Sequence, residues 1–234
     1  MEIFRGNFKS LETALVEQKL HNTKDAFSSI RWINRQYSFL DMSKKGIAPR
    51  YSSLPSFLKE HVQIDLVVDI GGGSGWIFNL LQPITQKPLT YFNIELKEMC
   101  QEFSKEFSHT SHVQFVDSWE SIVSLKEISL VYSNSTMQYI SDEVFFRNFN
   151  ELNLPKYVVF DDFIVTSSKG YWTLQNYYGD FIPYHFRNLA EFNLNMFELG
   201  YAVISVDDYR QNLAPGFSYG NEGMPQTIVY ELCR

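Results

Sequence analysis

The first 60 residues carry apolar positions at helical spacing and show no strong strand pattern. Residues 10–20 begin with a serine suited to an N-cap and read as a short amphipathic helix. A second helix is predicted from about residue 23 to Gly46, a residue type that commonly ends helices. A third, short helix follows a turn at Pro49. We therefore expect residues 1–60 to form an N-terminal helical cap.

From residue 65 onward, short apolar runs alternate with helical segments, which predicts a mainly parallel sheet with helices on both faces. The predicted strands are residues 65–70, 89–96, 112–118, 128–134, 156–165, 201–209 and 225–233. The predicted helices are residues 75–81, 97–107, 141–151 and 188–199. The last two strands follow one another without a helix, which suits an antiparallel hairpin. Long aromatic loops are expected over residues 161–187 and 210–225.

Residues 65–76, DLVVDIGGGSGW, join a buried strand to a helix through a glycine-rich turn. Alternate glycines allow positive φ angles and let a ligand approach the backbone. We expect the ligand to meet open amide groups of the turn and of the helix N-terminus. The dinucleotide-binding pattern G-x-G-x-x-G needs a third glycine where this chain has Trp76, which weakens a NAD-binding interpretation.

The run D-x-G-x-G-x-G resembles the first motif of the class I methyltransferases that use S-adenosylmethionine (SAM). The resemblance implies a Rossmann-like α/β fold with a seven-stranded sheet whose last strand is antiparallel. It makes residues 61–234 the SAM-binding domain, behind the cap. It also implies that the turn packs against the methionine and ribose portions of SAM, and the cofactor-binding residues expected there are Asp69, Gly71, Gly72, Gly73 and Gly75.

Ligands of open parallel sheets bind at the carboxyl ends of the strands. Glu95 ends the second strand, where a carboxylate can accept hydrogen bonds from both hydroxyls of a ribose; a solvated helix-capping acid is the alternative. The resemblance places Asp117 near the adenine amino group, with Ser118 supplying a backbone amide, although either could simply cap a helix. Ser133 and Gln138 complete the expected cofactor site.

The chain also resembles a narrower group, the methyltransferases encoded in bacterial surface-polysaccharide (capsule and O-antigen) gene clusters. The matching features are R-x-x-x-L over residues 50–54, an S-x-x-x-Q-Y-like segment over residues 134–139, the pair Asp161-Asp162 and residues 175–183. That group commonly has Asp-Arg where this chain has two aspartates. The resemblance implies an O-methyltransferase that acts on a sugar or sugar-phosphate precursor of such a polysaccharide.

Methyl transfer to a hydroxyl requires alignment of the reacting atoms and removal of a proton. The candidate bases are His185, Asp161 and Asp162, although a histidine among aromatic residues is more often a packed structural residue. The acidic pair could instead hold Mg²⁺. The fourth strand offers Ser133 and Asn134 where such a site needs an aspartate, so no metal is expected.

Charged and aromatic residues are expected to contact the acceptor, because arginines bind phosphate or uronate groups and aromatic rings stack on sugars. Surface charge and core packing are the alternatives for the same residues. The residues expected to bind the acceptor are Arg50, Tyr51, Trp172, Gln175, Tyr178 and Arg187.

Composition narrows the class of protein further. The formal net charge of −7 argues against a nucleic-acid partner, because no basic stripe is available to neutralise phosphates. Cys100 and Cys233 lack metal spacing and are expected to be free thiols in a reducing cytoplasm. No apolar run approaches the length of a membrane span and no secretory pattern opens the chain, so a cytoplasmic protein is expected.

Other functions stay open at this level. The acceptor could be a small metabolite, a phosphate or phosphoramidate oxygen, or an amine. The chain could also be a non-catalytic SAM-fold partner subunit, although the intact glycine motif and Glu95 argue against a degenerate protein. The sequence leaves open whether the N-terminal helices form a lid or the contact of a homodimer.

Overall fold

The computed structural model describes residues 3–21, 27, 29–85, 87–177, 179–212 and 223–233. Its central sheet has the strand order β4-β3-β2-β5-β6-β10-β9, and only β10 runs antiparallel to its neighbours. This confirms the predicted α/β class and the antiparallel last strand. The strands are β2 Leu66–Ile70, β3 Thr90–Ile94, β4 Val113–Val116, β5 Leu130–Asn134, β6 Tyr157–Thr166, β9 Tyr201–Asp208 and β10 Met224–Leu232.

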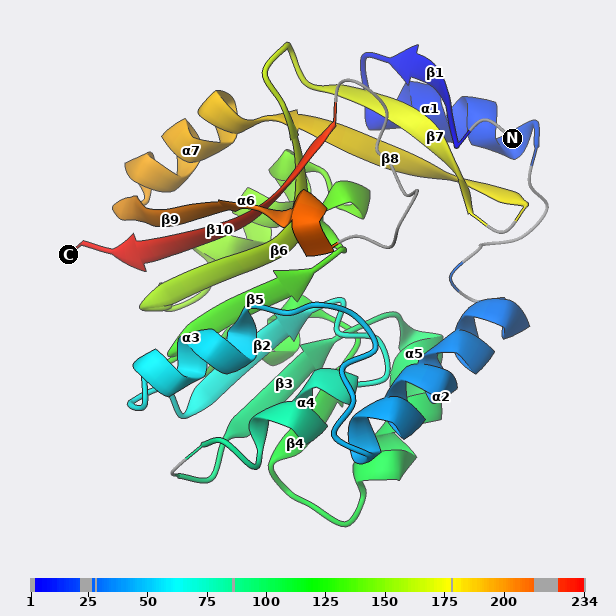
Figure 1. The fold of residues 1–234 in the computed structure, drawn as a ribbon. Coiled ribbons are helices and arrows are strands. Elements are labelled where there is room, and N and C mark those ends of the chain that lie inside the picture. The colour runs from blue at the N-terminus through cyan, green and yellow to red at the C-terminus, as the bar shows by residue number, and fades with distance from the viewer. Residues whose placement is uncertain are drawn as a thin grey trace.

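Helices cover both faces of this sheet (Figure 1). Residues of α2 to α5 pack with one face in a first core cluster that includes Leu40, Leu58 and Phe103. Residues of α6 and α7 pack with the other face in a second cluster around Phe145 and Phe192. The helices are α2 Ile30–Lys44, α3 Leu54–Glu60, α4 Trp76–Leu81, α5 Lys97–Phe103, α6 Asp142–Asn150 and α7 Leu189–Glu198.

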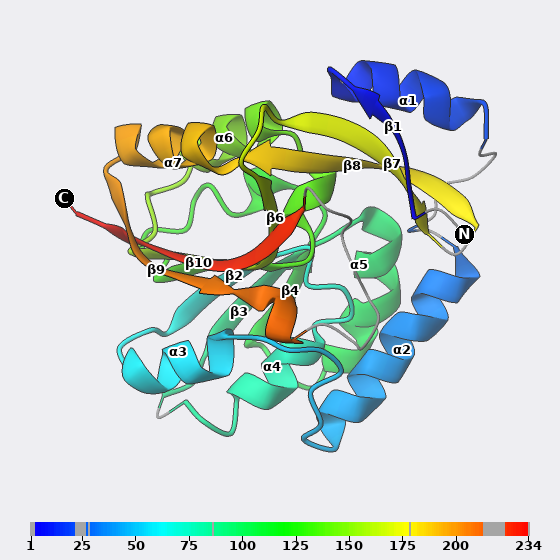
Figure 2. The same ribbon diagram turned by 45° about the horizontal axis from the view of Figure 1, so that its top comes forward.

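An antiparallel extension continues the sheet beyond β6 in the order β1-β7-β8 (Figure 2). Its strands are β1 Phe4–Phe8, β7 Tyr171–Tyr177 and β8 Asp180–Asn188, and α1 Leu11–Lys19 lies on one face. The end of β6 pairs in parallel with β8. The expectation of a long loop over residues 161–187 is therefore wrong, because most of that segment is β6 and a hairpin. A strand also lies in the N-terminal segment, where no strand pattern was recognised.

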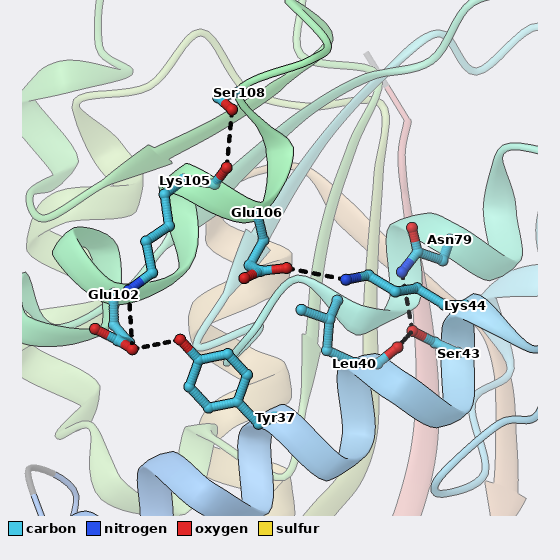
Figure 3. Close-up of polar contacts among 9 residues, drawn as sticks. All are labelled: Tyr37, Leu40, Ser43, Lys44, Asn79, Glu102, Lys105, Glu106 and Ser108. Carbon is cyan, nitrogen blue, oxygen red and sulfur yellow. Dashed lines mark hydrogen bonds and ion pairs between the residues drawn. The ribbon is translucent and has the colours of Figure 1, made fainter.

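Side-chain contacts fix α2 against α4 and α5 (Figure 3). Lys44 forms an ion pair with Glu106, in the 3-10 turn Ser104–Phe107 that follows α5, with an Nζ–Oε2 distance of 2.9 Å. Asn79 of α4 donates a hydrogen bond of 3.0 Å to the Ser43 hydroxyl. The Tyr37 hydroxyl donates to the carboxylate of Glu102, as Figure 3 shows. Consequently, α2 has a defined position beside the glycine turn.

Within the described part of the chain, no helix combines the length and the apolar character that crossing a membrane requires. The two cysteines, Cys100 and Cys233, are free thiols, as predicted.

Candidate functional site

The glycine turn follows β2 and has the conformation that its sequence predicts. Gly71, Gly73 and Gly75 have positive φ angles of 70°, 59° and 71°. A Cβ atom on Gly71 would lie 2.3 Å from the Thr136 side chain, and one on Gly73 would lie 2.3 Å from Gln36 Oε1. The glycines are therefore needed for the backbone conformation and for contacts with the protein's own side chains.

The amide groups of the turn are not open, in contrast to the expectation from sequence. The Gly71 amide donates to the carbonyl of Ile94, and that of Gly75 to the carbonyl of Gly72. The other three donate to side chains: Gly72 to Asn93 (3.0 Å), Gly73 to Glu95 (2.9 Å) and Ser74 to Gln36 (3.0 Å). A ligand at this edge would therefore meet side chains that surround the turn rather than a row of free amides.

Asp69 lies beneath the turn with 2% of its surface exposed. Its Oδ2 accepts a hydrogen bond from the Tyr91 hydroxyl, and its Oδ1 has no partner among the described residues. Burial raises the pKa of Asp69 to about 7, opposed by the Tyr91 hydrogen bond. Asn93 fixes the position of the turn, because its Oδ1 accepts from the Gly72 amide and its side-chain amide donates to the Gly73 carbonyl at 2.9 Å. Asn93 was missed, although a polar residue inside an apolar strand is a visible signal.

Glu95 directly follows β3 beside the turn and is a partly exposed residue. Its Oε1 accepts from the Gly73 amide and its Oε2 from the Leu96 amide at 2.8 Å. Burial raises the pKa of Glu95, and these two backbone hydrogen bonds lower it. Each oxygen keeps acceptor capacity, because an ionised carboxylate offers about four lone-pair positions.

Asp117 is exposed at the end of β4, and Ser118 beside it is partly buried. Burial raises the pKa of the Cys100 thiol to about 11, with further contributions from Glu95 and Asp117. Both carboxylates therefore lie near one thiol at the carboxyl edge of the sheet. Ile94 of β3 pairs with Val116 of β4, so Glu95 and Asp117 follow the carboxyl ends of two adjacent parallel strands.

The segment after β5 packs directly on the turn. Ser133 is buried and donates a hydrogen bond of 3.1 Å to the Ile70 carbonyl, which joins β5 to β2. Thr136 donates to the Gly71 carbonyl at 3.2 Å. Gln138 is 2% exposed, and its Oε1 has no hydrogen-bond partner in the described structure.

A β-bulge sets the direction of the acidic pair. Phe163 of β6 pairs with Gln226 of β10, and Phe160 pairs with Ile228. Only Thr227 lies between these two partners, so Asp161 and Asp162 both lie opposite Thr227. Phe160 and Phe163 stack on the same side of the sheet, with ring centroids 5.1 Å apart. The side chains of Asp161 and Asp162 consequently both lie on the opposite side of the sheet, whereas regular alternation would have placed them on different sides.

The two aspartates have different environments. Asp161 accepts hydrogen bonds from the Ser53 amide (2.7 Å), the Tyr132 hydroxyl (2.8 Å) and the Thr227 hydroxyl (2.8 Å). Burial raises its pKa, and these hydrogen bonds lower it. Asp161 thus joins residues 50–54 to the carboxyl ends of β5 and β6. Both of its carboxylate oxygens accept hydrogen bonds from the protein itself.

Asp162 has a positive φ of 50°, which costs conformational energy in a residue other than glycine. Ser135, also at a positive φ of 57°, donates a hydrogen bond of 2.6 Å to Asp162 Oδ2. Two strained residues that face one another at the carboxyl edge are typical of functional sites.

Residues from four segments gather beside Asp162. Its negative charge adds to burial in raising the pKa of Tyr139 and of Tyr209. The Tyr139 hydroxyl donates to Gln175 Oε1 at 2.9 Å, and the Tyr209 ring lies 5.5 Å from that of Tyr51. The positive charge of Arg50 lowers the pKa of Tyr139 and Tyr209 against these effects. We name this the acceptor cluster; its members are Arg50, Tyr51, Tyr139, Asp162, Gln175 and Tyr209.

His185 and Trp172 lie on the other face of the hairpin. Their rings stack with centroids 4.5 Å apart and an angle of 4° between the planes. Trp172 belongs to a small core with Ala14 of α1, whereas side chains alternate along β7 and Gln175 faces away from that core. Burial, and then Arg187, lower the pKa of His185 to about 3, which makes it a weak base.

Arg187 has no exposed surface. It donates hydrogen bonds to Asp142 and to the Ile140 carbonyl, and it lies over the rings of Phe163 and Phe192. We therefore leave Arg187 out of the acceptor site proposed below. Tyr178 lies outside the described residues.

A metal site and a surface hollow are the other kinds of site that the described residues could form. In the described part of the chain, no three His, Cys, Asp or Glu side chains gather as a metal site. A hollow of about 400 Å³, lined by residues that include Lys126, Asn153 and Tyr157, lies at the opposite, amino-terminal edge of the sheet. The glycine turn and the exposed carboxylates place the candidate site at the carboxyl edge instead.

The sequence matches no protein-family model and no curated protein. An S-adenosylmethionine-dependent methyltransferase from Mesorhizobium loti shares 13% identity, over 76% of this chain and 97% of that chain, with a TM-score of 0.53. Geranyl diphosphate methyltransferase in complex with SAM shares 13% identity over 98% of each chain, with a TM-score of 0.53. A pericyclic reaction enzyme aligns at 12% identity over 97% of this chain and 60% of that chain, with a TM-score of 0.57. These similarities establish the fold, and the activity must be argued from the site.

Proposed function

We propose that the chain is a SAM-dependent O-methyltransferase whose acceptor is a sugar or sugar-phosphate precursor of a bacterial surface polysaccharide. The observation that carries the cofactor is the glycine turn after β2 with Glu95, a partly exposed residue, bonded to its Gly73 amide. The fold around them is similar to that of solved SAM-dependent methyltransferases, with TM-scores of 0.53.

The side chains at the carboxyl edge fit SAM. Each oxygen of Glu95 uses one lone pair on a backbone amide, so the carboxylate can still accept from two adjacent ribose hydroxyls. Asp117 is exposed beside it for the adenine amino group. When bound, SAM supplies an electrophilic methyl group on a sulfonium.

Asp162 is the residue of the acidic pair that we assign as the base. Asp161 already accepts three hydrogen bonds, and the pKa of His185 is too low for efficient proton removal near neutral pH. Asp162 lies near Tyr139 and Tyr209 in the acceptor cluster, and its hydrogen bond from Ser135 fixes the orientation of its carboxylate. It would remove the proton of the acceptor hydroxyl.

The N-terminal segment contributes to both halves of the site. Gln36 of α2 bonds to the turn, whereas Arg50 and Tyr51 belong to the acceptor cluster. We therefore propose that residues 1–60 cap the site and contact the acceptor. The carbohydrate identity of the acceptor rests on the resemblance of residues 50–54 and 134–139 to the polysaccharide-cluster group, and these two segments meet where Asn134 donates to the Tyr51 carbonyl.

An activity screen tests the proposal. The purified full-length chain is incubated with SAM and with sugar phosphates, nucleotide-activated sugars, neutral sugars and small amines, and release of S-adenosylhomocysteine is measured. Methylation of a sugar hydroxyl is the expected result. Transfer to an amine would keep the cofactor and overturn the assignment of the acceptor, and SAM binding without transfer to any member would favour a non-catalytic partner subunit.

A further inference from the structure

Asn134, the last residue of β5, connects the acceptor cluster to the neighbour of Asp162. Its Nδ2 donates hydrogen bonds to the Tyr51 carbonyl (2.9 Å) and to the Tyr132 hydroxyl (3.0 Å). Because the Tyr51 carbonyl can only accept, the nitrogen of the Asn134 amide has to lie on that side and Oδ1 on the other. This Oδ1 lies 3.0 Å from the Ser135 hydroxyl, which can donate to it. Asn134 therefore offers Ser135 an acceptor.

The hydrogen bonds around Tyr132 have fixed directions. The Tyr132 hydroxyl has a single hydrogen, and it points to the carboxylate of Asp161 at 2.8 Å. The Ser52 hydroxyl, at 2.7 Å, and the Asn134 amide must then both donate to the Tyr132 oxygen, which has two lone pairs. The position of Asn134 is therefore fixed by groups other than Asp162.

The Ser135 hydroxyl, in contrast, has two acceptors for one hydrogen. Its Oγ lies 2.6 Å from Asp162 Oδ2 and 3.0 Å from Asn134 Oδ1. An ionised carboxylate is the stronger acceptor, so the hydrogen points to Asp162 while that group is charged. When Oδ2 carries a proton, Asp162 becomes the donor, Ser135 Oγ accepts, and the Ser135 hydrogen can turn to Asn134. Rotation of one hydroxyl thus satisfies both protonation states of Asp162.

The backbone fixes Ser135 in the position that this exchange requires. Its amide donates to the Asp161 carbonyl at 3.0 Å, and its φ of 57° is a conformation that a residue with a Cβ keeps only where the surrounding structure imposes it. Asp162 has a positive φ of 50° as well. Two strained residues therefore bring Ser135 Oγ and Asp162 Oδ2 within 2.6 Å of one another.

Other ionisable groups also lie around Asp162. Asp161 precedes it on the same side of the sheet, Tyr139 lies in the 3-10 turn after β5, and Tyr209 lies in the one after β9. The positive charge of Arg50 acts on both tyrosines. A substitution at position 134 or 135 keeps all of these groups in the chain, so it tests the exchange of the hydroxyl between its two acceptors.

We propose that Ser135 and Asn134 are positioning residues for the proton transfer to Asp162: the Ser135 hydrogen bonds to the ionised carboxylate and turns to Asn134 Oδ1 when Asp162 Oδ2 takes up the proton. In this step the O–H bond of the acceptor breaks and the O–H bond of Asp162 forms, while the O–H bond of Ser135 stays intact. Since Asn134 also holds the Tyr51 carbonyl, one side chain links the base to the acceptor-binding segment. This inference rests on the proposed function, because it concerns the base of the same site.

The pKa of Asp162 tests the inference without an acceptor or turnover. The full-length protein is labelled with aspartate that carries an NMR-active isotope at the carboxyl carbon, and the chemical shift of Asp162 is followed with pH. Its signal is identified by its loss in Asp162→Asn. Ser135→Ala should raise the pKa of Asp162 by about one unit, because it removes a donor to the charged form. Asn134→Ala should lower it by roughly half a unit or more, because Ser135 then loses the acceptor that it needs when Asp162 is protonated.

Ser108→Ala is the matched control, because it removes an exposed serine hydroxyl that donates to the Lys105 carbonyl and should leave the pKa of Asp162 unchanged. Thermal melts show whether each variant folds. Ser135→Gly, which tolerates a positive φ, and Asn134→Leu, which keeps the size of the side chain, serve where the alanine variants do not fold. An unchanged pKa of Asp162 in the folded Ser135 variants, or a failure of the Asn134 variants to shift it in the opposite direction, would overturn the inference.

A parallel titration with SAM separates the two proposals. Opposite pKa shifts in a protein that binds no SAM contradict only the methyltransferase. SAM binding and methyl transfer with an unchanged pKa of Asp162 in the Ser135 variants contradict only the exchange of the Ser135 hydroxyl between its two acceptors.

Discussion

Two adjacent aspartates of β6 illustrate how position decides chemistry at the scale of single residues. Asp161 has three hydrogen-bond donors and holds residues 50–54 in place. Asp162 has a strained backbone and faces the tyrosines of the acceptor cluster. Both identities could be read from the sequence, but the bulge opposite Thr227 that turns both carboxylates to one side could not. A bulge depends on the partner strand, which lies more than 60 residues later in the chain.

The assignment of Asp162 as the base predicts that Asp162→Asn lowers the turnover number by about 10² or more, with little change in SAM affinity. Turnover is measured by S-adenosylhomocysteine release and affinity by calorimetry. His185→Gln should retain turnover within a few-fold, because His185 is stacked on Trp172 on the other face of the hairpin. Full activity of Asp162→Asn, or its loss in a folded His185→Gln protein, would contradict the assignment.

Glu95 supports a second prediction. Glu95→Gln should weaken SAM binding at least tenfold, because a hydrogen bond to a charged group contributes roughly 1.5–3 kcal/mol. Glu98→Gln removes an exposed carboxylate from the first turn of α5 and serves as the control. Calorimetry gives the affinities, and thermal melts should show that both variants remain folded. An unchanged affinity of Glu95→Gln would remove Glu95 from the ribose role.

At the scale of elements, the turn requires glycine for two reasons, the backbone conformation and the packing of neighbouring side chains. Gly71 and Gly46 have similar φ angles of 70° and 74°. A Cβ on Gly71 would meet the short, branched side chain of Thr136 at 2.3 Å, whereas nothing lies within 4 Å of one on Gly46. Comparison of the two positions therefore separates the cost of the backbone conformation from the cost of the steric clash.

Gly46→Ala should lower the free energy of unfolding by roughly 1–2 kcal/mol, the cost of a left-handed conformation with a Cβ. Gly71→Ala should lower it by more than Gly46→Ala does, because Thr136 or the turn must move. Urea denaturation of both variants measures the difference. Equal losses would show that Thr136 yields easily and that packing does not enforce the glycine.

The elements themselves could be predicted to different degrees. Strands β2, β5 and β10 and helices α6 and α7 lie within one or two residues of the predicted ranges, because each has a clear period of apolar positions. The strand β1 was missed, since its sequence FRGNF has one exposed face and little apolar content. Gln36 and Asn93 were missed as contacts of the turn, because their roles depend on which elements pack beside it.

At the scale of the whole molecule, buried and partly buried carboxyl groups link stability to pH. Burial raises the pKa of Asp69 to about 7 and also raises those of Glu95 and Asp161. A carboxyl group whose pKa is raised by folding binds its proton more tightly in the native state. Its contribution to stability is complete below its ordinary pKa and is lost as the pH rises through the native value.

Asp69→Asn tests this link, because it removes the titrating group and keeps an acceptor for the Tyr91 hydroxyl. Between pH 4 and pH 8, the wild-type protein should lose stability relative to Asp69→Asn by on the order of 3 kcal/mol. Urea denaturation across this range measures the difference. Asp65→Asn, at an exposed position before β2, is the control. A difference that does not vary with pH would show that Asp69 titrates normally.

The arrangement of the chain joins two structural parts at one edge. The central sheet supplies the glycine turn, Glu95 and Asp162, whereas the N-terminal segment supplies Gln36 and Arg50. The contacts of α2 with α4 and α5 in Figure 3 hold this segment against the sheet. Consequently, the N-terminal segment is part of the proposed site, and its removal should affect acceptor recognition as well as stability.

The central claim is that the carboxyl edge of this sheet binds SAM. Calorimetric titration of the purified, full-length protein with SAM, S-adenosylhomocysteine and NAD⁺ in parallel tests it most directly. We expect micromolar binding of SAM and S-adenosylhomocysteine, and no binding of NAD⁺. Binding of NAD⁺ alone, or of none of the three, would contradict the account.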